Sequence, residues 1–581
     1  MKVIREAIKK TLMVNDQWPM VDFVVEHPKE ESHGDYSSNV ALILAKQIGK
    51  NPRELAEAIV KQCHSDTVSQ IWERVEVAGA GFINFYLKKE FFLAETKKAI
   101  EPGYGKNETL KGKKIMVEYT DPNPFKEMHI GHLMSNTIGE SLARLQEASG
   151  AEVRRACYQG DVGLHVAKAI WGWQRKMDQE GKTLADFKGR TLKVKANYLG
   201  QAYAYGATKY ETDETAKSEM NAMNKVIYDK SDETIDELYQ AGREWSLEYF
   251  ESIYLRLGTK FDEYFFESEA GPVGLKVVEE GLAKKVLEIG DDGAVVYRGE
   301  KDGLHTRVFR NKLGLPTYEA KDLGLAKTKY ERYKYDFSYN VTGNEITEYF
   351  KVVLRVMEQL YPDLRAKTTH MPHGMMRLTT GKMSSRTGKV VTGEGLLNEL
   401  KVVVLTKMGG REIGDKDKVA DMIAVGALKY SVLKQAIGGN IVYEPEKMTN
   451  LEGDTGPYLQ YTFARCSSVL RKSQISNPPA GRAGSQILKL GALQSYEPCN
   501  TEELAILRWI YRYPEVVSEA GEKMAPHLLA TYLFELAQRF NTFYNQHQIV
   551  GDEGRILLTS AVANVLKSGL GLLGIQAPEE M

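Results

Sequence analysis

Residues 115–132 read IMVEYTDPNPFKEMHIGH, and this stretch decides the fold of the middle of the chain. The apolar run Ile115–Thr120 predicts a buried strand, and the breaker-rich segment Asp121–Pro124 predicts the turn that ends it. A helix is predicted next, with Gly150 as its carboxyl-terminal stop. Its apolar face is formed by residues spaced three and four apart, Met134, Ile138, Leu142 and Leu145. The stretch therefore predicts a strand, a tight loop and a helix.

The tetrapeptide His129-Ile130-Gly131-His132 lies where this loop meets the helix. A helix amino terminus that follows a strand favours phosphate binding, because its unpaired backbone N–H groups point at the ligand. Gly131 would let the backbone approach such a ligand closely. His129 and His132 could both donate to a polyphosphate that gathers charge during a reaction. An ordinary loop with two histidines and a glycine is an equally good interpretation of the tetrapeptide alone.

A second segment, Gly381–Lys389, concentrates cations, hydroxyls and glycines in a short loop. A lysine supplies a point charge for a phosphate, and hydroxyls and backbone amides complete the cradle. The candidate ligands here are Lys382, Ser384 and Ser385. Taken alone, such a segment is more often a solvated basic loop.

Together, the two segments resemble the paired signature motifs of class I aminoacyl-tRNA synthetases, whose second motif has the consensus Lys-Met-Ser-Lys-Ser. Here Ser385 and Arg386 take the fourth and fifth positions, and the first lysine is retained as Lys382. The run Glu118–Lys126 is similar to the Glu-Tyr-Ser-x-Pro-Asn-x-x-Lys run of arginyl-tRNA synthetases, with Asp121 where many members have serine. The resemblance continues in order along the chain, over Tyr158–Gly163, Thr317–Gly324, Gly453–Tyr461 and Phe540–Tyr544.

The resemblance implies an α/β catalytic domain with a Rossmann-like parallel sheet, an α+β amino-terminal domain and an all-α anticodon-binding bundle. We expect an amino-terminal tRNA-binding domain at residues 1–108 and the catalytic domain at residues 109–395. A helical insertion is expected around residues 174–240, and its charges are interpreted as a solvated face. A helical connection at residues 396–449 and the anticodon-binding domain at residues 450–581 would follow.

The resemblance also implies an arginine–tRNA ligase. ATP and L-arginine would form arginyl-adenylate and pyrophosphate, and the arginyl group would pass to the 3′ end of tRNA(Arg). Catalysis of such an in-line attack on phosphorus rests on positioning and electrostatics. Mg²⁺ would screen the polyphosphate, held by ATP oxygens more than by protein carboxylates. Members of this family are typically monomeric and cytoplasmic, and they need bound tRNA before they form the adenylate.

The residues that the resemblance assigns to ATP lie in the two signature motifs: His129, Gly131, His132, Lys382, Ser384 and Ser385. Of these, His129, His132 and Lys382 are also expected to act in catalysis. Lys126, just before the first motif, would add a second cation.

Arginine needs a different set of residues, because its guanidinium is a planar fork that matches a carboxylate in bidentate fashion. Asp322 is the leading candidate, and the Tyr318 hydroxyl, one helical turn away, is a second acceptor for the same pocket. Glu118 and Asn123 match family residues that bind arginine, and Glu118 fits either the guanidinium or the ammonium group. Asp121 either assists the cationic substrate or caps the turn.

Composition sets broad limits on the function. The 581 residues are enough for about three or four domains. The four cysteines contain no Cys-x-x-Cys pair, so neither a protein-held metal nor a disulfide framework is indicated. We expect no signal peptide and no membrane span, because no apolar run is long enough. A net charge of −1 leaves tRNA binding to a local basic strip.

Two other kinds of function share parts of this pattern. A class I synthetase for another amino acid, or a nucleotidylyltransferase on the same fold, would carry both phosphate-binding motifs. A simple nucleotidylyltransferase would not need the helical carboxyl-terminal third. A synthetase-derived RNA-binding protein that has lost activation would be expected to lack the histidines or Lys382, and this chain retains them.

Overall fold

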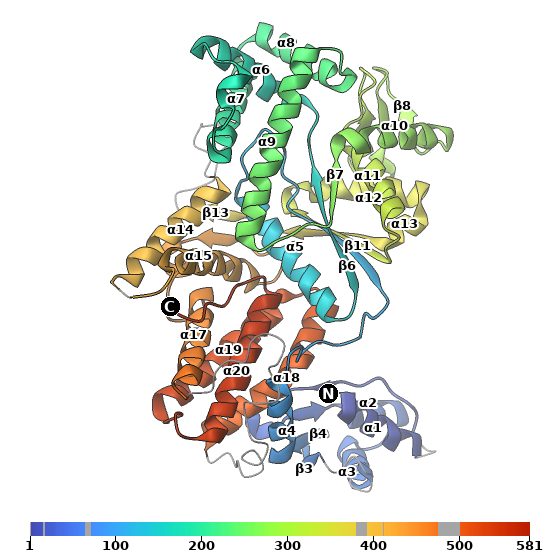
Figure 1. Ribbon diagram of the computed structural model, residues 1–581. Helices are drawn as coiled ribbons and strands as arrows, with labels where there is room; N and C mark the ends of the chain where they lie inside the picture. Colours follow the sequence, from blue (N-terminus) through green and yellow to red (C-terminus); the bar gives the residue numbers. More distant parts are fainter. Residues whose placement is uncertain (1, 15–17, 64–70, 379–391, 411, 474–499) are drawn as a thin grey trace. The chain divides into compact units, whose positions relative to one another are not determined.

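A computed structural model (Figure 1) describes the chain except for residues 1, 15–17, 64–70, 379–391, 411 and 474–499. The chain forms two compact units. Unit 1 comprises Met1–Gly105, Cys466–Val516 and Glu535–Leu566. Unit 2 comprises Lys106–Arg465, Val517–Phe534 and Lys567–Met581.

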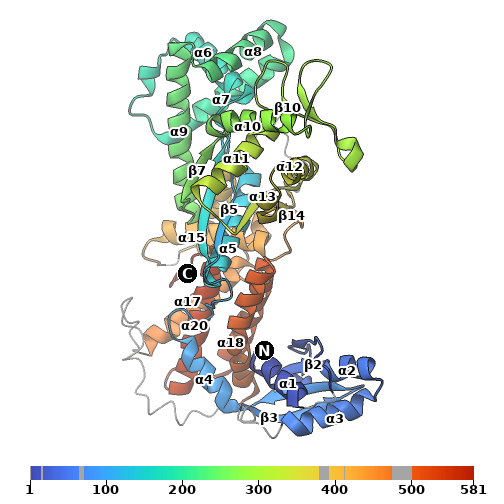
Figure 2. The same ribbon diagram turned by 90° about the vertical axis from the view of Figure 1, so that its right-hand side faces the viewer.

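Unit 1 contains an α+β module whose four-stranded antiparallel sheet has the order β1-β2-β4-β3. Its elements are α1 (Lys2–Val14), β1 (Val25–Glu26), β2 (Tyr36–Ser38), α2 (Val40–Ile48), α3 (Pro52–Cys63), β3 (Trp72–Ala78), β4 (Phe82–Leu87) and α4 (Lys89–Ala99). Asn51 caps α3, because its Oδ1 accepts from the backbone N–H of Arg53 at 2.9 Å. Helices α2 and α3 pack together and against β4 (Figure 2).

The carboxyl-terminal part of the chain is helical, with α17 (Gly456–Lys472), α18 (Thr501–Glu522), α19 (Pro526–Gln546) and α20 (Glu553–Leu572). A stripe along α19 that the spacing predicts as bundle core is fully buried: Leu529, Leu533, Leu536, Phe540 and Phe543. Within unit 1, the α+β module is tied to these helices. Arg508 lies 3.1 Å from the buried carboxylate of Asp35, and Asn564 donates to the carbonyl of Ala99 at 2.6 Å.

Unit 2 is built on a five-stranded parallel sheet with the order β12-β11-β5-β6-β7. The strands are β5 (Lys114–Glu118), β6 (Glu152–Gln159), β7 (Glu263–Phe266), β11 (Phe337–Gly343) and β12 (Thr368–His373). From β5 the chain first builds outward through β6 and β7, and it later adds β11 and β12 on the other side. The reversal lies between β5 and β11, and ligands of open parallel sheets bind at the carboxyl ends of the strands beside such a reversal.

The two faces of β5 carry different layers. Helix α5 (Ile130–Ala148) covers one face, and the Tyr119 hydroxyl donates to Glu140 of this helix at 2.5 Å. The predicted stop at Gly150 is confirmed by its φ of +92°, just after the helix ends. On the other face, Met116 packs into a core with α10 (Glu267–Ala283), α11 (Tyr318–Arg332) and α12 (Thr347–Leu360).

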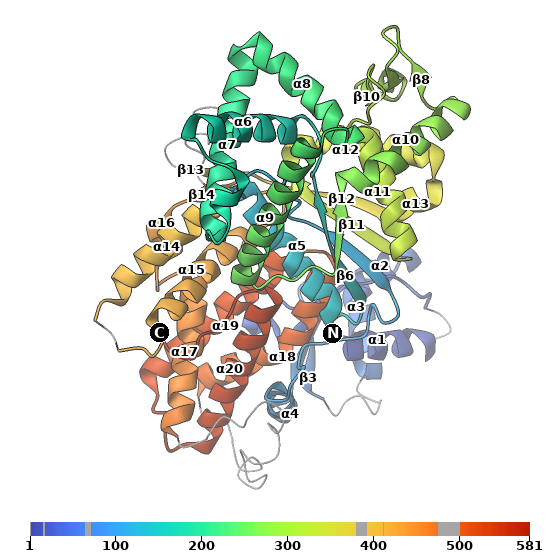
Figure 3. The ribbon, with the colours of Figure 1, turned by 45° about the horizontal axis from the view of Figure 1, so that its top comes forward.

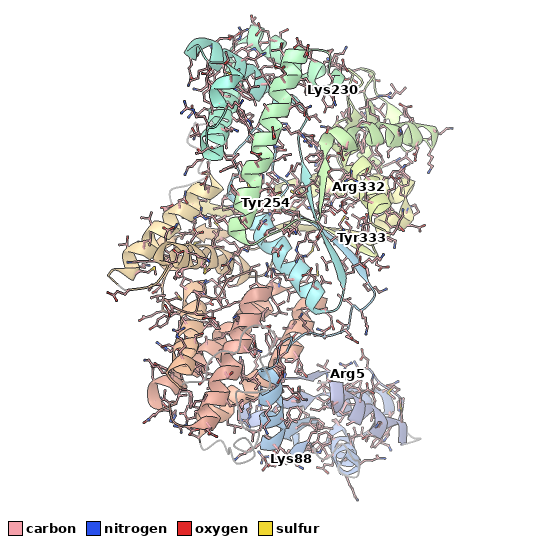
Figure 4. The ribbon with its side chains drawn as sticks, in the orientation of Figure 1. Arg5, Lys88, Lys230, Tyr254, Arg332 and Tyr333 are labelled. Carbon is pink, nitrogen blue, oxygen red and sulfur yellow. The ribbon has the colours of Figure 1, made fainter. Side chains whose placement is uncertain are left out.

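The carboxyl end of α11 is fixed to the sheet by two residues labelled in Figure 4. Arg332 donates to the carbonyl of Tyr264 in β7 at 3.1 Å, and Tyr333 donates to the carbonyl of Glu152 in β6 at 2.9 Å. A small antiparallel sheet lies between α10 and α11 in sequence, formed by β8 (Glu288–Ile289), β9 (Val295–Tyr297) and β10 (Arg307–Arg310). This sheet was not predicted from the sequence.

Four long helices lie between β6 and β7 in sequence and pack together (Figure 3): α6 (Leu164–Glu180), α7 (Leu192–Thr212), α8 (Glu214–Asp229) and α9 (Glu233–Leu257). We call them the helical insertion. Their core is aromatic, with Trp173, Phe187 and Trp245 in mutual ring contact. The insertion is thus built around a hydrophobic core, which Phe125 of the loop after β5 also joins.

Helix α13 (Pro362–Lys367) immediately precedes β12. The elements that follow the parallel sheet in sequence are β13 (Met376–Leu378), α14 (Gly393–Met408), α15 (Lys416–Leu433), β14 (Ile441–Tyr443) and α16 (Pro445–Met448). Lys429 of α15 is fully buried and donates to the carbonyls of Leu257 at 2.6 Å and Gly574 at 2.8 Å. This buried amine joins the end of α9 to the carboxyl-terminal segment.

Candidate active site

His129 and His132 form the amino-terminal cap of α5. The backbone N–H of Gly131 donates to Nδ1 of His129 at 3.1 Å, and the backbone N–H of His129 donates to Nδ1 of His132 at 3.1 Å. The two rings stack with their centroids 3.8 Å apart. Because both Nδ1 atoms accept hydrogen bonds, the proton of each neutral ring lies on Nε2. Each histidine therefore presents an Nε2–H donor.

Both imidazoles are held in the neutral form. Desolvation lowers the pKa of His129 and lowers that of His132 further, and the ammonium group of Lys126 acts in the same direction on both. Lys126 itself lies with its Nζ 4.4 Å from the ring centroid of Tyr203 on α7. Neutral donors that are fixed before reaction suit a site where negative charge develops in the transition state.

Gly131 is needed by the cap itself. A Cβ atom at this position would lie 2.9 Å from Cε1 and 3.0 Å from Nδ1 of His129. A side chain here would therefore push the His129 ring out of its cap position. This reason is separate from the close approach of a ligand that the sequence suggests.

The loop between β5 and α5 is strained. Thr120, Asp121 and Phe125 have φ values of +79°, +47° and +67°, and each such residue costs on the order of 1–3 kcal/mol. Hydrogen bonds hold the strained backbone: the N–H of Thr120 donates to Ser135 Oγ at 2.9 Å, and Asp121 Oδ1 accepts from the N–H of Tyr158 at 2.8 Å. The loop that carries Asn123 and Lys126 is thus fixed before any ligand arrives.

Glu118 and Asn340 lie opposite each other across the reversal between β5 and β11. Glu118 is 3% exposed and accepts from Lys329 Nζ at 2.7 Å and from Asn340 Nδ2 at 3.0 Å. Protein donors therefore engage both of its carboxylate oxygens. Lys329 and Asn340 were not predicted from the sequence. The signal for Asn340 was a polar side chain close to the carboxyl end of a strand.

Asp322 lies on α11, one turn after Tyr318, and is half-buried. Its Oδ2 accepts from the hydroxyl of Tyr349 at 2.6 Å. Burial, with smaller contributions from the negative charges of Glu118 and Glu267, raises the pKa of Asp322 to about 7 against the effect of this hydrogen bond. The hydroxyl that Asp322 binds is thus that of Tyr349, whereas Tyr318 begins the helix and is 58% exposed.

Glu267, the first residue of α10, lies beside the same cluster. Its carboxylate pairs with Lys321 of α11 at 2.6 Å, and both side chains are buried. A Cβ atom at Gly160 would lie 2.2 Å from Asn123 Oδ1 and 3.1 Å from Glu267 Oε1, so these two side chains meet over the glycine. Sequence reasoning missed Glu267 as well. Its signal was an acid placed directly after the strand Glu263–Phe266.

The structure thus brings the predicted arginine-binding residues to the carboxyl edge of the sheet. Asp121 belongs to the same cluster, because burial and then the charge of Glu118 raise its pKa well above the usual value. Tyr318 lies next to this cluster, because its ring centroid is 5.3 Å from the Nζ of Lys321, the partner of Glu267. We call the carboxylates of Glu118, Asp121, Glu267 and Asp322 the acid cluster.

Lys382, Ser384 and Ser385 lie outside the described residues. Thr392, the first described residue after that segment, forms an antiparallel bridge with His129. The next backbone N–H, that of Gly393, donates to the carbonyl of Met128 at 2.7 Å. The chain therefore contacts the first motif directly after it leaves the second.

Among the residues that the structure describes, no group of three or more His, Cys, Asp or Glu side chains is arranged to hold a metal ion. The described helices also include none with the length and apolar character needed to cross a membrane.

Several known proteins are similar to this chain. The arginine–tRNA ligase of Fusobacterium nucleatum is 31% identical over 561 residues, which cover 95% of this chain and 94% of the relative. That of Treponema denticola is 29% identical over 580 residues, which cover 96% and 94%. The solved arginyl-tRNA synthetase of Thermus thermophilus matches with a TM-score of 0.78 at 24% identity, over 100% of both chains. The arginyl-tRNA synthetase of Plasmodium falciparum also gives 0.78, at 22% identity, over 100% of this chain and 99% of that one.

Three family models match the chain in order. They are the arginyl tRNA synthetase N terminal domain over residues 1–87, the catalytic domain of tRNA synthetases class I (R) over residues 98–444, and the DALR anticodon binding domain over residues 459–581. With the parallel sheet and its capped α5, these matches define a class I aminoacyl-tRNA synthetase. Such enzymes use ATP. The chain belongs to the arginyl-tRNA synthetase family, so its substrates are arginine and tRNA and its reaction is their ligation. The family, fold class and function predicted from the sequence are confirmed.

Proposed function

We propose that this enzyme forms arginyl-adenylate at the carboxyl edge of its parallel sheet, between the capped end of α5 and the acid cluster. One observation carries the proposal: the single strained loop Tyr119–Met128 joins the acid cluster to the neutral histidine pair. A substrate that spans this loop would have its cationic side chain among carboxylates and its reacting carboxylate beside the phosphate donors. That arrangement is what activation of arginine requires.

On the ATP side, the Nε2–H groups of His129 and His132 would donate to the phosphates, and Gly131 would lie against the adenosine. Lys382, with Ser384 and Ser385, would hold the leaving pyrophosphate. The contact of Thr392 with His129 supports this assignment, because Thr392 is only three residues after the second segment in sequence. Lys126 would add a second positive charge. Losing one such preorganised group is expected to slow the chemical step by about 10²–10³.

Mg²⁺ is expected to reach the site with ATP and to neutralise part of the triphosphate charge. His129, His132 and Lys126 would then need to orient the phosphates rather than neutralise them fully. The neutral state of both imidazoles fits a site that binds the metal complex of ATP, because neutral donors add no charge repulsion toward the cation.

On the arginine side, Asp322 is proposed to bind the guanidinium through Oδ1, which accepts no protein hydrogen bond in the described part of the chain. Asp121 and Asn123 lie on the loop that leads to the histidines, so they are placed for the ammonium end of the substrate. Glu118, fixed by Lys329, would lie at the bottom of the pocket, between the sites for the guanidinium and the ammonium group. Tyr318, exposed at the start of α11, would close the pocket from solvent.

We also propose that residues 1–108 and 450–581 bind tRNA and that the enzyme acts as a monomer in the cytoplasm. The matches to the arginyl tRNA synthetase N terminal domain and the DALR anticodon binding domain support the two RNA-binding assignments. Sedimentation equilibrium tests the oligomeric state. A mass near 65.3 kDa is expected, and a mass of twice that value would contradict it.

The test of the proposed reaction is aminoacylation of total tRNA with each of the twenty amino acids in turn. Only arginine should be attached, because a pocket built on carboxylate–guanidinium hydrogen bonds can reject other side chains by roughly 10⁴–10⁵. ATP–pyrophosphate exchange should require arginine and be stimulated by tRNA(Arg). Exchange that depends on lysine or glutamine instead would refute the assignment of the acid cluster.

A further inference from the structure

Lys126 has unusual surroundings for a lysine at an active site. Within the described part of the chain it makes no ion pair and no side-chain hydrogen bond. Its ammonium group instead lies 4.4 Å from the ring centroid of Tyr203, which is half-buried on α7. The same charge lowers the pKa values of His129 and His132, so the ammonium lies close to the histidine pair.

The helical insertion contacts three consecutive residues of the loop. The backbone N–H of Phe125 donates to Ser246 Oγ of α9 at 2.9 Å, and the Phe125 ring is part of the core of the insertion. Lys126 lies over Tyr203. Glu127 follows, and its Oε2 would be 3.2 Å from a Cβ at Gly200, one turn before Tyr203 on α7. The loop that leads to the histidines is therefore seated on α7 and α9.

An aromatic face holds a cation differently from a carboxylate. The quadrupole of the ring attracts the ammonium but carries no net charge. A carboxylate at the same place would neutralise much of the charge that a phosphate is meant to meet. Glu267 is an anionic competitor for Lys126, but it is already paired with Lys321. Burial raises the pKa of Glu267, and the charge of Lys321 opposes that rise more strongly than the charge of Lys126 does. The ring of Tyr203 can thus fix Lys126 and leave its charge available.

We propose that Tyr203 of the helical insertion is a positioning residue for adenylate formation, which holds the Lys126 ammonium over its ring so that the charge faces the ATP phosphates. The inference rests on the role proposed above for Lys126. This proposal gives the insertion a part in catalysis. From the sequence, its charges are interpreted only as a solvated face. The insertion would then hold one catalytic cation, Lys126, in position.

The experiment measures ATP–pyrophosphate exchange by the full-length enzyme with saturating tRNA(Arg), for Tyr203→Leu, Tyr203→Phe and Lys126→Gln. Tyr203→Leu should lower kcat about twofold to fivefold, as expected for one partly exposed cation–π contact, with the KM for arginine unchanged. Tyr203→Phe keeps the ring face and should keep kcat. In the Lys126→Gln background, Tyr203→Leu should have no further effect, because the two residues act as one unit.

The matched control is Tyr210→Leu. Tyr210 is on the same helix, is also half-buried, and holds Lys168 at 3.6 Å from its ring centroid. Its loss removes the same kind of contact from the insertion without touching Lys126, so kcat should not change. Thermal unfolding of each variant shows whether the helices remain folded.

Each other outcome overturns the inference in a recognisable way. Equal losses in Tyr203→Leu and Tyr203→Phe would assign the effect to the hydroxyl, and equal losses in Tyr203→Leu and Tyr210→Leu would assign it to the insertion as a whole. A loss confined to transfer of arginine onto tRNA would make Tyr203 an RNA contact. An unchanged Lys126→Gln enzyme would remove the proposed role of Lys126 itself, whereas a slow Lys126→Gln with a normal Tyr203→Leu would refute only the positioning role.

Discussion

Replacing Asp322 with asparagine tests the arginine pocket with the smallest possible change. The substitution keeps the shape of the side chain and an oxygen that can accept from the Tyr349 hydroxyl, now 2.6 Å from Oδ2. It removes the negative charge and replaces one acceptor with an N–H₂ donor, which cannot pair with a guanidinium. The expected result is a selective loss of arginine binding.

The size of the loss follows from the bond that disappears. A hydrogen bond to a charged group contributes about 1.5–3 kcal/mol, so kcat/KM for arginine should fall by about 10- to 150-fold. The KM for ATP should change by less than about threefold, because the histidine cap of α5 is untouched. ATP–pyrophosphate exchange with tRNA(Arg) present, run once with arginine varied and once with ATP varied, separates the two parameters.

The pH dependence provides a second measurement on the same residue. Because the pKa of Asp322 is raised to about 7 in the free enzyme, the carboxyl group is protonated below that pH and must lose its proton to bind a guanidinium. The KM for arginine should therefore rise as the pH falls below about 7, by at most about tenfold per unit. Asp322→Asn should lack this rise.

Asp336→Asn is the matched control for this experiment. Asp336 accepts from the backbone N–H of Lys114 at 2.9 Å, at the amino ends of the strands and away from the acid cluster. Its neutralisation should leave both KM values unchanged. The reasoning about Asp322 is refuted if its substitution raises the KM for ATP as much as that for arginine, or if the variant keeps the pH dependence of the wild type.

Three other substitutions have definite expected outcomes. Gly131→Ala should lower kcat for pyrophosphate exchange by about 10²-fold, because the new methyl group would lie 2.9 Å from the His129 ring; a normal kcat would mean that the cap tolerates the methyl group. Ser135→Ala should lower the free energy of unfolding in urea by about 2–4 kcal/mol, because the N–H of Thr120 and the carbonyl that Ser135 now binds would be left unpaired. Burial lowers the pKa of Lys429 to about 7, so the folded protein binds fewer protons than the unfolded chain between pH 7 and about 10. The free energy of unfolding of the wild type, relative to Lys429→Met, should therefore rise with pH across that window by at most about 1.4 kcal/mol per unit, and a flat difference would argue against a buried neutral amine.

The fold around β5 and α5 was predictable because its signals are local. The apolar run Ile115–Thr120 and the breakers after it give β5 and its loop, and the helical spacing up to Gly150 gives α5. The small sheet β8–β10 was not predictable in this way. Its strands have only two to four residues, which is too short for an alternating pattern to stand out.

The site was predictable in part for the same reason. Glu118, Asn123 and the histidines lie in one continuous run, so a single local match finds them. The lysines that neutralise the carboxylates of the site come from elsewhere in the sequence. Lys329 is 211 residues from Glu118, and Lys321 is 54 residues from Glu267. The sequence around a helical lysine does not show whether that lysine is a buried counter-ion. Only the packing of α10 and α11 on the sheet reveals which acids are already neutralised.

That neutralisation gives a physical reason for the proposal that the acid cluster binds arginine. Of the four carboxylates in the acid cluster, Glu118 and Glu267 are paired with buried lysines at 2.7 Å and 2.6 Å. Burial raises the pKa of Asp121 and Asp322, as it does that of Glu267, but in the described part of the chain only these two of the four have no lysine or arginine paired with them.

An amino acid with a positive charge at each end supplies the two cations that the acid cluster lacks. A neutral side chain of similar length would leave Asp322 protonated, and it would gain no charge-assisted hydrogen bond there. A lysine side chain would supply the charge, but only as a point donor, whereas the several N–H donors of a guanidinium can bind Oδ1 of Asp322 and a second acceptor at the same time. We therefore propose that selectivity for arginine depends on which carboxylates the protein leaves without a cation of its own.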